Sequence, residues 1–155
     1  MTLWPGTCIV HEQFNECELI KLSTRHPNAK IAAHPECPDP ILRNADHAGS
    51  TSSIFRHVTT ESAQEYIVAT EQHIIHQMQL AAPDRTFLPA PGADGGCDCA
   101  NCPFMALNSL EKLYLALANE APYVEIPEEL RVAALAPLQR MLELSPSSPR
   151  ARYAA

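Results

Sequence analysis

The stretch Glu65-Tyr66-Ile67-Val68-Ala69-Thr70, together with the segment 71–80 that follows it, decides how this chain folds. Its first six residues combine aromatic, β-branched and small apolar side chains, which is typical of a buried strand. The next ten place large apolar side chains at the spacing of a helix that packs on a sheet. Pro83 ends that helix, and Thr86-Phe87-Leu88-Pro89 offers another strand. A strand, a helix and a strand in this order form the unit from which parallel sheets are built.

The segments before this stretch repeat the alternation. The pattern predicts the tail of a strand over 8–11, a helix over 12–26, a short strand over 29–33 and a short helix over 40–45. Small polar residues at 49–52 can cap a further helix that runs to about His57. We therefore expect an α/β fold, a three-layer α/β domain with a short parallel sheet, over residues 1–102.

A second segment, residues 103–145, is predicted to be mainly helical. Pro103 suits the first position of a helix over 104–119, because its missing N–H is not needed there. A short strand over 123–126 and a last helix over 128–144 should follow, and the tail over 146–155 should be disordered. Both helices carry apolar residues along one face.

Composition narrows the classes of function. The 155 residues are 46% apolar and carry a net charge of -7, so they offer no basic field for nucleic acid or an anionic membrane. No apolar run approaches the length of a membrane span, and the first residues lack the pattern of a signal peptide. These features predict a cytoplasmic protein with reduced thiols, in which clustered cysteines indicate metal or redox chemistry.

Polar residues that could bind a ligand or take part in catalysis follow the predicted strands, and parallel sheets form their sites at these strand ends. His34 and Glu36 can act as acid and base or hold a polar substrate, although a plain surface loop would also explain them. Ser50 and Thr51 offer hydroxyls at a helix N-terminus, which suits a carboxylate or phosphate as well as simple capping. The stretches 8–11 and 70–71 end strands in the same way.

The loop before Pro103 carries Cys97, Cys99 and Cys102 within six residues. A closed zinc site needs four ligands, and the chain lacks a second cysteine pair of the usual form. Three thiolates are enough for an iron–sulfur cluster with one open iron. The loop could equally serve a non-catalytic metal- or redox-binding protein, or its thiols could be incidental. Only Cys102 lies at a helix start, where a thiolate is favoured.

Five stretches, taken in order, resemble the quinolinate synthase family. They are Trp4-Pro5-Gly6-Thr7-Cys8-Ile9-Val10-His11, His34-Pro35-Glu36-Cys37-Pro38, Gly49-Ser50-Thr51-Ser52, Ile67-Val68-Ala69-Thr70-Glu71 and Cys102-Pro103-Phe104-Met105-Ala106-Leu107-Asn108. The family condenses iminoaspartate with dihydroxyacetone phosphate to quinolinate in de novo NAD biosynthesis. Its fold has three similar α/β domains, and its [4Fe–4S] cluster is held by three cysteines, with one iron open to substrate.

The resemblance implies roles for individual residues. Cys8 and Cys102 match cluster ligands, and His34 and Glu36 match catalytic residues that hold the substrate near the open iron. Thr51 matches a substrate-binding hydroxyl, with Ser50 and His11 as weaker substrate-binding candidates. Cys97 and Cys99 match extra thiols that some members carry, which could form a redox-sensitive disulfide.

The resemblance covers only the C-terminal half of the family's chain. The first cluster cysteine and the substrate residues of the first two domains lie upstream in the family. The family's last helices return to complete the first domain, so we expect residues 103–145 to need a missing N-terminal half or another chain. This chain alone is therefore expected to be inactive.

Overall fold

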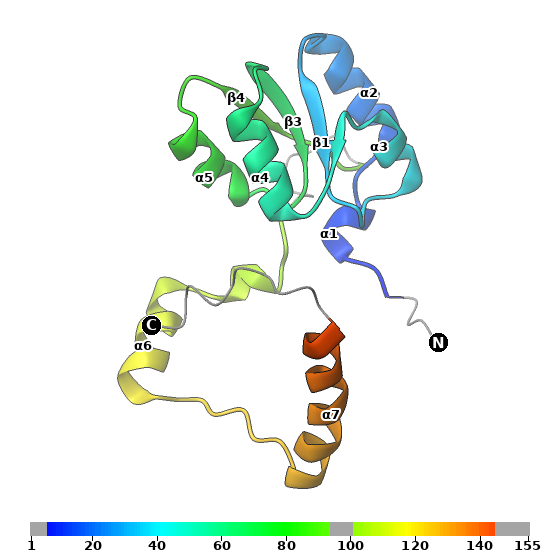
Figure 1. The fold of residues 1–155 in the computed structure, drawn as a ribbon. Helices are drawn as coiled ribbons and strands as arrows, with labels where there is room; N and C mark the ends of the chain where they lie inside the picture. Colours follow the sequence, from blue (N-terminus) through cyan, green and yellow to red (C-terminus); the bar gives the residue numbers. More distant parts are fainter. Residues whose placement is uncertain (1–5, 94–100, 145–155) are drawn as a thin grey trace. The chain divides into compact units, whose positions relative to one another are not determined.

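The computed structural model describes residues 6–93 and 101–144 (Figure 1). The predicted tail over 146–155, Cys97 and Cys99 lie outside the described residues. The chain divides into two compact units, residues 1–108 and residues 109–155. The first unit contains α1 (Ile9–Glu12), α2 (Glu16–Arg25), β1 (Lys30–Ala33), α3 (Asp39–Asn44), β2 (His47–Ala48), α4 (Thr51–Thr60), β3 (Glu65–Ala69), α5 (Ile74–Ala81) and β4 (Thr86–Pro89), followed by a 3₁₀ turn (Met105–Leu107).

The sheet of the first unit has the order β2-β1-β3-β4, and every neighbouring pair is parallel. In the register, Ala32 lies opposite Val68 and Tyr66 opposite Phe87. The predicted strand at Glu65–Ala69 is β3, which pairs on both sides and is almost completely buried. The predicted short parallel sheet is confirmed.

Alternating side chains of the strands build a separate core on each face of the sheet, because successive residues of a strand point to opposite faces. One core joins the sheet to α1, α2 and α3, and the other joins it to α4 and α5, which lie side by side in Figure 1. These are the three layers that the alternation predicts. The first core includes Val10, Leu19, Ile31, Ile41 and Ile67, and the second includes Ile54, Val58, Tyr66, Val68 and Met78.

Side-chain caps fix where two helices of the first unit begin. Asn15 Oδ1 accepts a hydrogen bond from the Glu18 N–H at 3.2 Å, which starts α2. Ser50 Oγ accepts one from the Ser53 N–H at 3.3 Å, which starts α4. Each cap satisfies a backbone donor that has no partner within its helix.

Two local predictions are wrong, and one strand was not predicted. Residues 8–11 do not end a strand, since Ile9–Glu12 forms the helical turn α1, with Val10 and His11 both turned into the core. Residues 123–126 are extended but form no strand, because no described strand pairs with them. The missed strand β2 has only two residues, too few for any periodic pattern.

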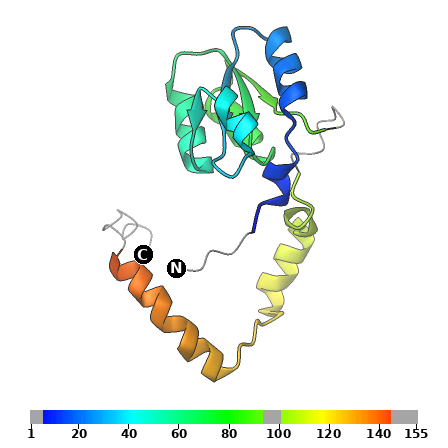
Figure 2. The ribbon, with the colours of Figure 1, turned by 90° about the vertical axis from the view of Figure 1, so that its right-hand side faces the viewer.

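The second unit contains α6 (Leu110–Asn119) and α7 (Glu128–Leu144), joined by an extended segment (Figure 2). Helix α6 begins later than predicted, because Ser109 caps it and the 3₁₀ turn precedes it. Neither helix has a buried residue among those described. Their apolar side chains, including Leu113, Tyr114, Leu117, Leu130 and Leu138, are exposed.

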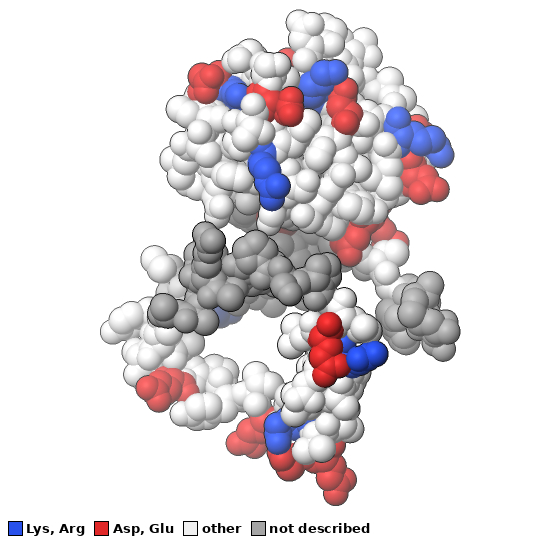
Figure 3. Space-filling view, in the orientation of Figure 1, with Lys and Arg blue, Asp and Glu red and all other residues white. Residues whose placement is uncertain are grey.

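Charged side chains of both signs are interspersed over the face of the first unit that Figure 3 draws. Among the described residues, no helix combines the length and the apolar character that crossing a bilayer requires.

Candidate functional site

The strand order makes β1 and β3 the topological switch point of the sheet, and we call the region outside their carboxyl ends the crevice. From β1 the chain leads through α3 to β2 on one side, whereas β3 leads through α5 to β4 on the other. Sheets of this kind bind ligands at the carboxyl ends of the two strands where the direction reverses. His34 follows β1 and Thr70 follows β3, and the His34 N–H donates to the Ala69 carbonyl at 3.0 Å. The order of the strands therefore brings two polar strand ends together.

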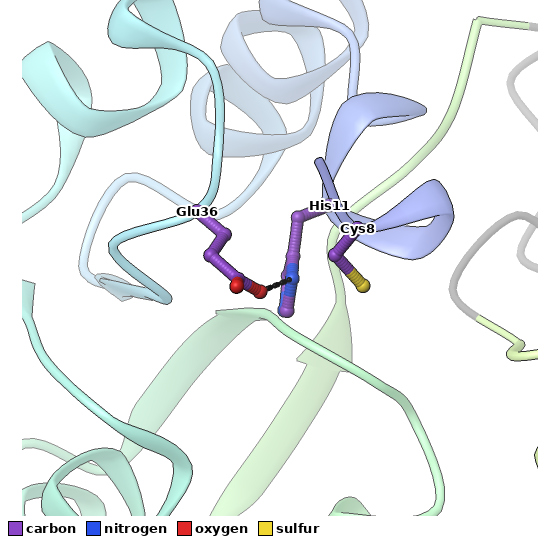
Figure 4. Close-up of side chains that lie close together, drawn as sticks. All are labelled: Cys8, His11 and Glu36. Atoms are coloured by element: carbon purple, nitrogen blue, oxygen red, sulfur yellow. Dashed lines mark hydrogen bonds and ion pairs between the residues drawn. The ribbon is translucent and has the colours of Figure 1, made fainter. Parts of the chain in front are cut away.

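His11 lies between Glu36, from the loop after β1, and Thr70, which follows β3, and it is only 6% exposed. Its Nδ1 is 3.1 Å from Glu36 Oε2, and its Nε2 is 3.1 Å from Thr70 Oγ1 (Figure 4). An ionised carboxylate only accepts hydrogen bonds, so we assign the proton of neutral His11 to Nδ1. The Thr70 hydroxyl then donates to Nε2, and both ring nitrogens are satisfied.

His34 stacks on His11, with ring centroids 4.2 Å apart and planes 6° from parallel. The Glu36 N–H donates to His34 Nδ1 at 3.3 Å. In neutral His34 the proton is therefore on Nε2, which is left to donate to a ligand. The Glu36 side chain is 56% exposed, so its carboxylate is open to solvent while it holds His11.

Burial lowers the pKa of His11 below its usual 6.5, and the neighbouring His34 lowers it further, whereas Glu36 opposes both effects. His11 is therefore held as a neutral imidazole near pH 7. A neutral ring keeps one nitrogen lone pair available to accept a hydrogen bond or to bind a metal ion.

Cys8 brings a sulfur atom to the same place. Its Sγ, a His11 ring nitrogen and a Glu36 carboxylate oxygen all lie within 4.8 Å of one another. Thiolate, imidazole and carboxylate are the side-chain ligands that transition metals use in proteins. Figure 4 shows His11 on α1 and Cys8 just before that helix, while Glu36 comes from the loop after β1.

The other described thiols differ in their surroundings. Cys102 is half-buried and packs against the same core as Cys8. Cys37 is buried, its thiol donates to the Ala69 carbonyl at 3.4 Å, and burial raises its pKa to about 11. Cys37 is thus a protonated core residue rather than an available thiolate ligand.

Ser50 and Thr51 lie at the N-terminus of α4. Thr51 lines a hollow of about 220 Å³, together with Ser52, Phe55, Ile74 and Gln77. Among the hydrogen bonds and ion pairs of the described residues, none joins Ser50 or Thr51 to the group around His11. The structure therefore brings together Cys8, His11, His34 and Glu36, and it adds Thr70.

Two hydrogen bonds near the site were not predicted from the sequence. Thr70 was noticed only as part of a strand end, and the bond from its hydroxyl to His11 spans 59 positions. The Gln72 side-chain amide donates to Asn101 Oδ1, which ties the residue before Cys102 to the segment after β3. Neither pairing leaves a signal in a single sequence, because the partners are distant along the chain.

Comparison with known proteins decides the family. The model of the family described as "Quinolinate synthetase A protein" matches residues 1–143. The chain belongs to this family. It is 51% identical over 145 residues to a quinolinate synthase from Thermosynechococcus vestitus, covering 94% of this chain and 46% of that protein. Similar proteins from Synechococcus sp. and Trichodesmium erythraeum are 52% and 53% identical over the same share of this chain.

Membership of the quinolinate synthase family, which the five stretches predict, is confirmed. The chain nevertheless spans less than half the length of these relatives, 46% of the first and 45% of the other two.

Proposed function

We propose that this chain supplies part of the active site of a quinolinate synthase, which condenses iminoaspartate with dihydroxyacetone phosphate to quinolinate in the cytoplasm. One observation carries the proposal. In a chain of this family, Cys8, His11, His34 and Glu36 gather at the crevice between β1 and β3, where a sheet of this topology binds its ligand.

Cys8 and Cys102 are proposed to hold two corners of a [4Fe–4S] cluster. Both thiols are half-buried and pack on one core, so they are accessible yet partly shielded from water. Cys37 is unsuited as the third ligand, since its buried thiol stays protonated. Cys17 is exposed on α2 and is not part of that core, so the third thiolate is proposed to come from outside residues 6–93 and 101–144. When bound, the cluster supplies a Lewis-acidic iron that polarises a substrate oxygen.

The residues around the crevice are proposed to bind substrate and move protons. Glu36 presents an exposed carboxylate that can take up a proton, and its hydrogen bond to His11 fixes its orientation. His34 Nε2–H can donate to a substrate carbonyl or carboxylate oxygen. Thr51, with Ser50 beside it, can anchor a carboxylate at the N-terminus of α4.

The rest of the site is proposed to come from the part of the relatives that this chain does not match, either as an N-terminal half or as another chain. The exposed apolar side chains of α6 and α7 support this proposal, since such surfaces mark interfaces.

The test is anaerobic reconstitution of the full 155-residue chain with iron and sulfide, followed by an assay for quinolinate. We expect iron to bind and no quinolinate to form, because part of the site is missing. Sustained turnover by this chain alone would contradict the proposal that it supplies only part of the site.

A matched pair of variants tests the role of Cys8. Cys8→Ser should lower the bound iron, whereas Cys17→Ser should not, since Cys17 is exposed on α2. Equal iron in both variants would instead favour a non-catalytic metal- or redox-binding protein that uses Cys97, Cys99 and Cys102.

A further inference from the structure

The short segment Thr70-Glu71-Gln72, directly after β3, contacts the stretches of chain that carry the two proposed cluster cysteines. We propose that Gln72 and Asn101 are positioning residues, whose side-chain hydrogen bond holds Cys102 in place. Cys102 thereby stays on the core that it shares with Cys8. This inference rests on the proposed function, which makes Cys102 a ligand. The hydrogen bond itself lies within the first unit.

Asn101 is the immediate neighbour of Cys102 in the chain. The Gln72 side-chain amide donates to Asn101 Oδ1 across a partly buried contact. Consecutive Cα atoms are about 3.8 Å apart, so a bond that fixes Asn101 also fixes where the Cys102 side chain begins. Cys102 is itself half-buried and packs on the core. The bond therefore limits the positions that the Cys102 thiol can take.

Gln72 lies on a turn that its own hydrogen bonds fix. The Gln72 carbonyl accepts from the Ile75 N–H at 3.0 Å, at the start of α5. Glu71 Oε2 accepts from the His73 N–H at 3.0 Å, and the Glu71 side chain is only 18% exposed. Because the backbone on both sides of Gln72 is already ordered, its side chain can hold Asn101 at a small further cost in conformational entropy.

The same strand end holds the stretch that carries the other proposed ligand. Thr70 Oγ1 is 3.1 Å from Nε2 of His11, which follows Cys8 closely in the chain. Strand β3 pairs on both sides and is almost completely buried, so its end is fixed by the sheet. Thr70 and Gln72 thus tie two distant stretches to one rigid element. A site built from several ligands needs supporting contacts of this kind to keep its geometry.

The positioning is tested first on the reduced, metal-free full chain. Each chain is treated briefly with iodoacetamide, and peptide mass spectrometry gives the alkylation rate of Cys102, with exposed Cys17 as the internal reference. Gln72→Ala and Asn101→Ala should raise the Cys102 rate by about 2- to 10-fold, the range expected when one hydrogen bond is lost. Gln64→Ala is the matched control and should change nothing, because it removes the same amide at an exposed position.

Isosteric variants separate the hydrogen bond from packing. Gln72→Glu leaves an acceptor to which the Asn101 amide can donate, and Asn101→Asp keeps the acceptor of the present bond. The two changes together leave two carboxylates and no donor, in side chains of unchanged shape. Each single variant should therefore label Cys102 at about the wild-type rate, and the double variant at least about as fast as Gln72→Ala. Buried Cys37 should stay unlabelled in every variant, which shows that the core remains folded.

Iron retention connects the hydrogen bond to the proposed cluster. After anaerobic reconstitution with iron and sulfide, a chelator is added and the loss of iron and of cluster absorbance is followed. Gln72→Ala and the double carboxylate variant should release iron at least about 2-fold faster than wild type. The two single carboxylate variants should release it at the wild-type rate.

Equal labelling of Cys102 in wild type, Gln72→Ala and the double variant would overturn the proposal, and so would faster labelling with unchanged iron release. A failure of the proposed function looks different. If wild type and Cys102→Ser hold and release iron alike, Cys102 is not a ligand and the proposed cluster assignment fails. The labelling rates then still decide whether the Gln72–Asn101 bond positions Cys102.

Discussion

The contribution of the Thr70–His11 hydrogen bond to the free energy of unfolding can be measured by substitution at Thr70. Thr70 is 1% exposed and His11 is 6% exposed, so water cannot replace the bond if the hydroxyl is removed. Thr70→Val keeps the shape of the side chain but leaves His11 Nε2 without a donor. An unsatisfied buried polar group of this kind costs about 1–3 kcal/mol of the free energy of unfolding.

Thr70→Ser is the matched control, because it keeps the hydroxyl and removes one methyl group. Loss of a buried methyl costs about 1 kcal/mol. If the hydrogen bond dominates, the order of stability is wild type, then Ser, then Val. If packing dominates, Val should equal wild type and Ser should be the least stable, so the order of the two variants decides between the causes.

Urea unfolding at about pH 7.5, followed by circular dichroism, gives the two midpoints. Amide hydrogen exchange at Val68 and Ala69 locates the effect on β3, next to the substitution, rather than on the second unit. A Thr70→Val chain with wild-type stability and wild-type exchange on β3 would refute the reasoning.

Three other predictions concern single features. Cys37→Ala should leave the iron content of the reconstituted chain unchanged while lowering its unfolding midpoint, because the thiol is buried and bonded to Ala69 rather than to metal. Ser50→Ala should cost about 1 kcal/mol in urea unfolding and Ser50→Gly only a few tenths, because Ser50 caps α4. Burial and the nearby His47 lower the pKa of His57 below 6.5, so the unfolded chain takes up a proton first as the pH falls. Urea midpoints should therefore drop as the pH falls below about 6.5, and His57→Gln should make that drop smaller.

The sheet could be predicted because its central strands, β1 and β3, are buried on both faces. Residues 66–69 and 31–33 are apolar runs, a pattern that is typical of the strands of a parallel sheet. The same reasoning gave the wrong structure for residues 8–11. A stretch of four residues is too short to distinguish a helical turn from a strand end, and in α1 the adjacent residues Val10 and His11 are both buried. Tyr123-Val124-Glu125-Ile126 has strand-like composition, but a strand forms only where another strand supplies the hydrogen bonds.

The candidate site could be predicted in part for a similar physical reason. His34 and Glu36 follow a buried strand, so their place at the crevice follows from the topology of parallel sheets. The position of His11 between Glu36 and Thr70 depends on how α1 packs, which no local pattern encodes. Likewise, the contrast between Cys8 and Cys37 is one of burial, and burial becomes visible only in the folded chain.

The two units differ in what holds them together, and that difference bears on the chemistry. Every residue of the group around His11 belongs to the first unit, which has a core on each face of its sheet. The second unit has no buried side chain among its described residues, and a helix as short as α6 is marginal in water without tertiary packing. The candidate site and the Thr70–His11 bond thus lie within the first unit. We propose that the stability of α6 and α7 depends instead on a surface that covers their apolar side chains, supplied by the part of the relatives that this chain does not match.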